Sequence, residues 1–141
     1  MDARTYKPTR EDLARATADL EAALEGVPLR ARMQLMVAAD EIFANIVRYS
    51  QATSWSFGVT FTESPRAVTL VFEDDGVAFD PLEARDPDTT LSAADRPVGG
   101  LGILIVRKTM SPVTYARRDG LNVLTLGKNL EGEENGHHEE G

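Results

Sequence analysis

The sequence has 141 residues, of which 42% are hydrophobic and 27% are charged, as expected for one soluble globular domain. It contains no cysteine, which excludes disulfides, thiolate catalysis and zinc sites built from cysteine. The formal net charge of -8 disfavours direct binding to nucleic acid, which requires a basic surface.

The acidic residues are concentrated at one end of the chain. Residues 131–141 hold five glutamates and no apolar side chain, so we expect an acidic disordered tail that follows one domain over residues 1–130. The N-terminal segment has no apolar stretch typical of a signal peptide, and no apolar run could span a membrane. We therefore expect a cytoplasmic protein that does not contact the membrane.

The first half of the chain is predicted to form two helices and a β-hairpin. Thr9 is a predicted N-cap for a first helix that ends near Gly26, and a second helix begins at Pro28 with an apolar face. Two strands follow at Trp55–Thr62 and Ala67–Glu73, joined by a turn over residues 63–66.

The second half begins with a polar stretch over residues 80–97, which we interpret as a functional loop or lid because of its length. A buried helix is predicted at Leu101–Met110, and strands at Val113–Arg117 and Leu121–Leu126 form a second hairpin. Three helices and a mostly antiparallel sheet predict an α+β fold, a two-layer sandwich.

Two candidate functional groups lie on the second helix. Glu41 and Asn45 are four residues apart and therefore share one helix face. The carboxylate could orient or deprotonate an attacking hydroxyl group, and the amide oxygen is a suitable ligand for Mg²⁺. The alternative is an ordinary solvated polar stripe on an amphipathic helix.

Two glycine-containing motifs complete the set. Asp74-Asp75-Gly76 ends a strand, where a carboxylate could accept a hydrogen bond from the exocyclic amine of adenine and Gly76 would let the ring approach the backbone. The alternative is a simple Asp/Gly turn. Gly100, Leu101 and Gly102 open the buried helix, whose free N–H groups favour phosphate oxygens; the alternative is a lid hinge. The order of the three motifs indicates one adenine-nucleotide site.

Together these motifs resemble the GHKL ATP-binding fold, and within it the anti-sigma factor serine/threonine protein kinases. The resemblance covers roughly residues 10–128. It implies Glu41 as general base, Asn45 as Mg²⁺ ligand, Asp74 with Gly76 as the adenine reader, and the loop Gly100-Leu101-Gly102 at the phosphates of ATP. Some family members place an arginine before that loop, and Arg96 is the nearest counterpart here; a solvated lid arginine is the alternative.

The resemblance also implies partners and an activity. The expected function is phosphorylation of a serine on a small antagonist protein and regulation of a sigma factor by partner switching, with homodimerisation typical of the family. The sequence departs from the family pattern in its last strand, where Asn122 and Val123 stand near a common threonine. The alternative function is an ATP-binding interaction module without kinase activity.

Overall fold

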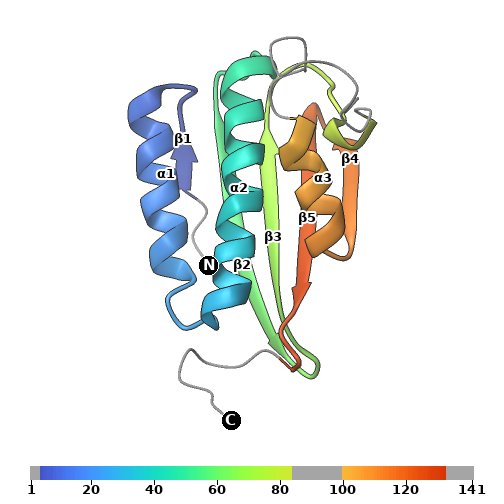
Figure 1. Cartoon of the computed structure of the whole chain (residues 1–141). Coiled ribbons are helices and arrows are strands. Elements are labelled where there is room, and N and C mark those ends of the chain that lie inside the picture. Colours follow the sequence, from blue (N-terminus) through green and yellow to red (C-terminus); the bar gives the residue numbers. More distant parts are fainter. Residues whose placement is uncertain (1–3, 84–99, 133–141) are drawn as a thin grey trace, which may run out of the picture.

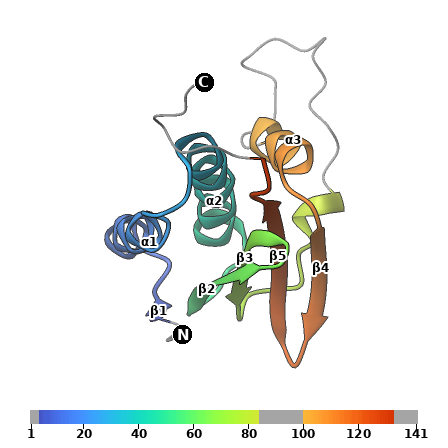
Figure 2. The ribbon, with the colours of Figure 1, turned by 90° about the horizontal axis from the view of Figure 1, so that it is seen from below.

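A sheet covered on one face by helices forms the domain, as Figures 1 and 2 show for the computed structural model, which describes residues 4–83 and 100–132. The helices are α1 (Arg10–Ala23), α2 (Leu29–Tyr49), α3 (Gly100–Thr109) and the short 3-10 helix η1 (Pro81–Glu83). The strands are β1 (Arg4–Tyr6), β2 (Trp55–Glu63), β3 (Arg66–Asp74), β4 (Val113–Arg118) and β5 (Leu121–Asn129). The predicted α+β sandwich is confirmed.

The sheet has the strand order β1-β2-β3-β5-β4, and every neighbouring pair is antiparallel. The β2–β3 and β4–β5 hairpins lie where the sequence predicts them. Strand β5 is three residues longer than predicted, because residues 127–129 pair with the beginning of β3. Most of the predicted lid (residues 84–97) and the predicted tail from residue 133 lie outside the described residues.

Helix α2 occupies the middle of the helical layer, between α1 and α3 (Figure 2). Its fully buried alanines, Ala31, Ala38 and Ala39, keep the packed face of the helix small and so permit close approach of its neighbours. Phe43 is fully buried on the same helix, and its ring lies 5.0 Å from that of Trp55 and 5.6 Å from that of Phe72. Burial of such a ring contributes roughly 1.5–3 kcal/mol, which fixes α2 against the sheet.

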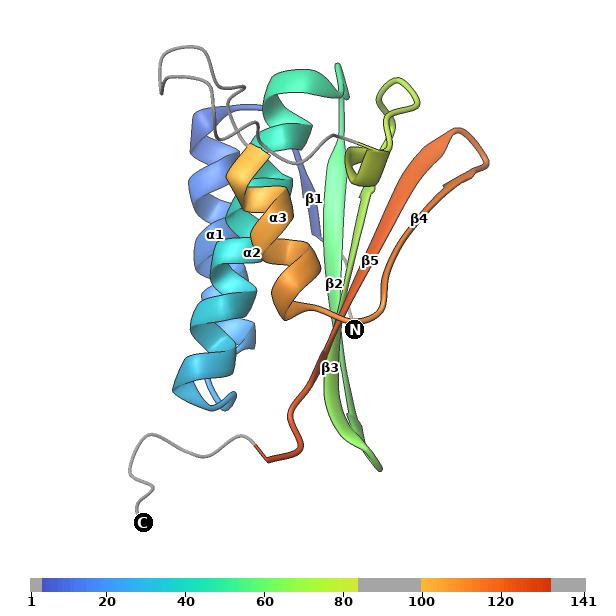
Figure 3. The ribbon, with the colours of Figure 1, turned by 45° about the vertical axis from the view of Figure 1, so that its right-hand side comes forward.

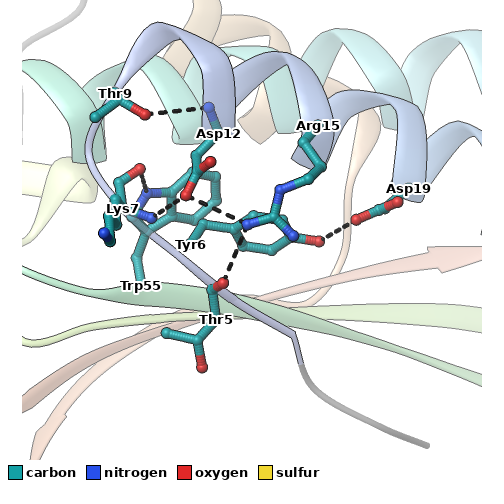
Figure 4. A network of polar contacts seen from close by, with 8 residues as sticks. All are labelled: Thr5, Tyr6, Lys7, Thr9, Asp12, Arg15, Asp19 and Trp55. Atoms are coloured by element: carbon teal, nitrogen blue, oxygen red, sulfur yellow. Dashed lines mark hydrogen bonds and ion pairs between the residues drawn. The ribbon is translucent and has the colours of Figure 1, made fainter.

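The short edge strand β1 is held by a polar network with α1 (Figure 4). The Tyr6 hydroxyl donates to Asp19 at 2.7 Å, and the Arg15 guanidinium lies 4.7 Å from the centre of the Tyr6 ring. The Lys7 carbonyl accepts from the Trp55 indole at 3.0 Å, which joins this network to β2. The predicted N-cap of α1 is confirmed, because Thr9 accepts from the backbone N–H of the third residue of the helix.

The ends of several helices and strands lie at one end of the molecule. Helix α2 and strand β3 both end there, and α3 begins there (Figures 1 and 3). All three motifs singled out in the sequence therefore belong to elements that meet at this end. In the described part of the chain, no helix combines the length and apolar character needed to cross a membrane.

Candidate functional site

A pocket lies between α2 and the sheet, near the end of the molecule where α2 and β3 terminate. Its floor and walls come from α2, β3, the segment before η1, β4 and β5. Apolar side chains predominate, with a few polar groups placed among them, which is the usual composition of a site for a small organic ligand. The lining residues are Ile42, Asn45, Ile46, Ser50, Phe72, Asp74, Phe79, Pro81, Tyr115, Asn122 and Leu124.

Asp74 supplies the acidic group of the pocket. It is the last residue of β3, it is 7% exposed, and its Oδ1 atom accepts hydrogen bonds from the Gly76 N–H and from the Asn122 amide, both at 2.9 Å. Asp75 has a different role, because its carboxylate accepts from the backbone and hydroxyl of Thr53 on the exposed surface. Of the two adjacent carboxylates, the structure thus brings Asp74 into the pocket.

Asn122 is a pocket residue whose importance the sequence did not reveal. It lies on β5 directly opposite Asp74 and is 5% exposed. Its amide donates to Asp74 and to the Val77 carbonyl, and its Oδ1 atom accepts from the Phe79 N–H and from the Tyr115 hydroxyl. In the sequence, Asn122 was noted only because its position in the last strand departs from the family pattern. Its hydrogen-bond partners come from three other segments of the chain.

Gly76 is buried at a close crossing of two backbone segments. A Cβ atom added here would lie 2.1 Å from the carbonyl oxygen of Ser50, the residue that follows α2. The next N–H, of Val77, donates to that same oxygen at 2.7 Å, and Arg117 donates to the Gly76 carbonyl at 2.8 Å. The close approach that the structure shows at Gly76 is to the end of α2, and the predicted approach of an adenine ring stays a prediction.

Glu41 and Asn45 share one face of α2, as their spacing predicts, and both are partly buried. Asn45 lines the pocket, whereas Glu41, which lies one helical turn before Asn45 on α2, is not among the lining residues. The Oε2 atom of Glu41 is buried and has no hydrogen-bond partner among the described residues. Burial raises the pKa of Glu41 above its ordinary value, and the nearby Asn45 amide and Arg48 guanidinium lower it by smaller amounts.

The predicted phosphate loop lies at the first turn of α3. Gly100, Leu101 and Gly102 are the first three residues of this helix, which begins one residue earlier than predicted. Backbone N–H groups in a first helical turn have no partner within the helix and can bind anions. Arg96, the other predicted phosphate contact, lies outside the described residues.

This arrangement suits a purine nucleotide with Mg²⁺. The pocket places apolar side chains beside the Asp74 acceptor, and α3 begins at the same end of the molecule, where its free N–H groups can bind anions. No group of three acidic or histidine side chains in residues 4–83 and 100–132 could enclose a metal ion. Magnesium bound to nucleotide phosphates needs only one or two protein ligands, which the Asn45 oxygen fits.

Comparisons with known proteins agree with an ATP-binding domain. A model of the histidine kinase-like ATPase domain matches residues 6–128. The serine/threonine-protein kinase BtrW of Bordetella bronchiseptica is 36% identical over 99 residues, which cover 69% of this chain and 70% of that protein. The solved structure of the Acinetobacter baumannii histidine kinase AdeS has a TM-score of 0.55 at 13% identity, covering 94% of this chain and 69% of that one.

The last of these similarities concerns the fold alone, because its sequence identity is low. The family match is a match in sequence, and it spans nearly all of the described residues, including the second helix, the end of β3 and the start of α3. The chain therefore belongs to the family of histidine kinase-like ATPase domains.

Proposed function

We propose that this protein is an ATP-dependent serine protein kinase of the anti-sigma factor type. It transfers the terminal phosphoryl group of ATP to a serine of a small antagonist protein, and it regulates a sigma factor by exchanging one partner for the other. Family membership supports ATP binding, and the name of the Bordetella relative, a serine/threonine-protein kinase, supports the kinase activity.

The observation that carries the proposal is the buried Oε2 atom of Glu41, which has no hydrogen-bond partner in residues 4–83 and 100–132. A buried carboxylate oxygen without a hydrogen-bond partner is costly, so a fold that retains one is expected to satisfy it with a ligand or substrate. A serine hydroxyl would donate to this oxygen, and the proton would pass to Glu41 as the serine oxygen bonds to the terminal phosphorus. The bond between that phosphorus and the oxygen bridging it to ADP would break, and ADP would leave.

The other groups have supporting roles in this proposal. The Asn45 oxygen would hold Mg²⁺, which neutralises phosphate charge when it is bound. The N–H groups at Gly100–Gly102 would bind phosphate oxygens, and Asp74 would accept from the adenine amine. Partner switching requires that the antagonist and the sigma factor prefer different nucleotide states, because a ligand shifts an equilibrium only by its differential affinity.

The test is phosphoryl transfer from γ-labelled ATP with Mg²⁺ to small serine-bearing proteins of the organism that encodes this chain. We expect label on a serine of one such protein, and loss of transfer in Glu41→Gln, which keeps the shape of the side chain but cannot accept the proton. Asp40→Asn is the matched control, because Asp40 is the adjacent, exposed carboxylate on α2. Nucleotide binding without any labelled protein would instead support the interaction module.

A further inference from the structure

Asn122 uses the full hydrogen-bonding capacity of its side chain inside the pocket. A carboxamide has two N–H donors and an oxygen with two lone pairs. Here the donors reach Asp74 Oδ1 at 2.9 Å and the Val77 carbonyl at 2.8 Å. The oxygen accepts from the Phe79 N–H at 3.2 Å and from the Tyr115 hydroxyl.

The chemistry of these partners fixes which way the amide points. Asp74 and the Val77 carbonyl offer lone pairs, and the Phe79 backbone nitrogen offers only a proton. Rotating the amide by half a turn would set acceptor against acceptor and donor against donor. No other common side chain of this size replaces it, because aspartate lacks the donors, leucine lacks all four groups, and threonine has a single donor.

The pairing determines how Asp74 meets a ligand. Both of its hydrogen bonds within the described residues reach Oδ1, from Gly76 and Asn122, so Oδ2 is left as the acceptor on a carboxylate that lines the pocket. The same amide also connects the segment Val77–Phe79 to strand β5 by hydrogen bonds. Phe79 forms part of the apolar wall, so one residue sets both the acceptor and the wall beside it.

We infer that Asn122 is a positioning residue that makes the pocket selective for purines carrying a 6-amino group. It holds Asp74 with Oδ2 presented to the exocyclic N–H of the base, while a 6-oxo purine would place an oxygen against this carboxylate. The inference rests on the nucleotide binding proposed above and extends it to a residue of β5 that need not touch the nucleotide.

The test compares two ligands that differ only in the 6-amino group, ATP and purine riboside triphosphate, by calorimetry in the presence of Mg²⁺. In the wild type, deleting the amine should weaken binding by about 10-fold or more, because a hydrogen bond to a charged acceptor is lost. In Asn122→Leu the ratio of the affinities for ATP and purine riboside triphosphate should fall to within about 2-fold. In a double-mutant cycle, deleting the amine costs little once the residue that positions its acceptor has been removed.

Two further variants keep the test decisive. Asn122→Ala removes both donors without placing bulk or charge beside Asp74, so its ratio of affinities should also fall, even where Asn122→Leu fails to fold. Asn129→Leu makes the same change at the exposed end of β5, where the side chain accepts from the Glu131 N–H, and this variant should retain the wild-type ratio of affinities.

The results separate this inference from the proposed function. If a folded Asn122 variant still binds ATP and has the wild-type ratio of affinities for the two ligands, the positioning role is overturned and the proposed function is not. A fall in all affinities by one common factor, with the ratio unchanged, shows that Asn122 is merely structural and overturns it equally. Failure of the wild type to bind ATP overturns the nucleotide site itself and the inference with it.

Discussion

Replacing Gly76 with alanine should be strongly destabilising, because the new methyl group would collide with backbone at the end of α2. The Cβ atom would lie 2.1 Å from Ser50 O, 2.7 Å from its carbonyl carbon and 2.8 Å from its Cβ, whereas ordinary contact begins near 3.4 Å. Ser50 cannot readily withdraw, since its hydroxyl donates to the Ile46 carbonyl at 2.7 Å and accepts from the Ala52 N–H. The segment at Gly76 must therefore move by about 1 Å or more.

That movement breaks or weakens two hydrogen bonds. The first joins the Val77 N–H to Ser50 O at 2.7 Å, and the second joins the Gly76 N–H to the Asp74 carboxylate at 2.9 Å. A neutral hydrogen bond contributes about 1 kcal/mol and one to a charged group about 1.5–3 kcal/mol, so the expected loss is about 2–4 kcal/mol. Urea unfolding measures this loss as a lower midpoint at an unchanged slope.

Gly58→Ala is the matched control for this substitution. Gly58 lies in β2, and a Cβ atom added there meets nothing within 4 Å. Its free energy of unfolding should therefore change by no more than about 0.5 kcal/mol. Equal stabilities of the two alanine variants would refute the close crossing at Gly76 and the account of how Asp74 is held.

Three further predictions concern the base, the core and the acid stability. Because burial raises the pKa of Glu41, serine phosphorylation should decline on acidification at a higher pH than for an exposed glutamate. The variant Asp40→Asn should show the same dependence on pH. A decline only near the ordinary pKa of glutamate would contradict the assignment of Glu41 as the base. Phe43→Ala should lower the free energy of unfolding by about 3–5 kcal/mol in urea, and a loss below about 1 kcal/mol would show that the aromatic cluster is not packed as described. Hydrogen bonding from Thr53 lowers the pKa of Asp75, so this carboxylate stabilises the fold at pH values above its ordinary pKa of 3.8, and the stabilisation is lost as the pH falls through the lower folded-state pKa. Asp75→Asn should flatten that part of the curve of stability against pH. The same slope in the variant and the wild type would contradict this account.

The elements with strong local patterns could be predicted from the sequence. The apolar face of α2 repeats at helical spacing, and the β2–β3 hairpin combines two apolar strands with a proline-containing turn, so local chemistry defines both. Strand β1 has three residues and no periodicity of its own, so no local sequence pattern predicts it. The extension of β5 depends on pairing with β3, which is a long-range contact.

The candidate site was predicted as a set of residue types, but its geometry was not. The pattern selected Asp74 rather than Asp75, and the structure brings Asp74 into the pocket because β3 ends there. The contact of Gly76 with Ser50 and the pairing of Asn122 with Asp74 join residues far apart in the chain. Neither contact leaves a local signature in the sequence, so both could be seen only in the fold.

The central claim is that the pocket beside Asp74 binds an adenine nucleotide. Calorimetric titration with ATP and ADP, with and without Mg²⁺, tests it most directly when the wild type is compared with Asp74→Asn. The account predicts Mg²⁺-dependent binding to the wild type and a loss of affinity of about 10-fold or more in the variant, because the acceptor for the adenine amine is weakened. Equal affinities of the two proteins for ATP, or no binding to the wild type, would contradict it.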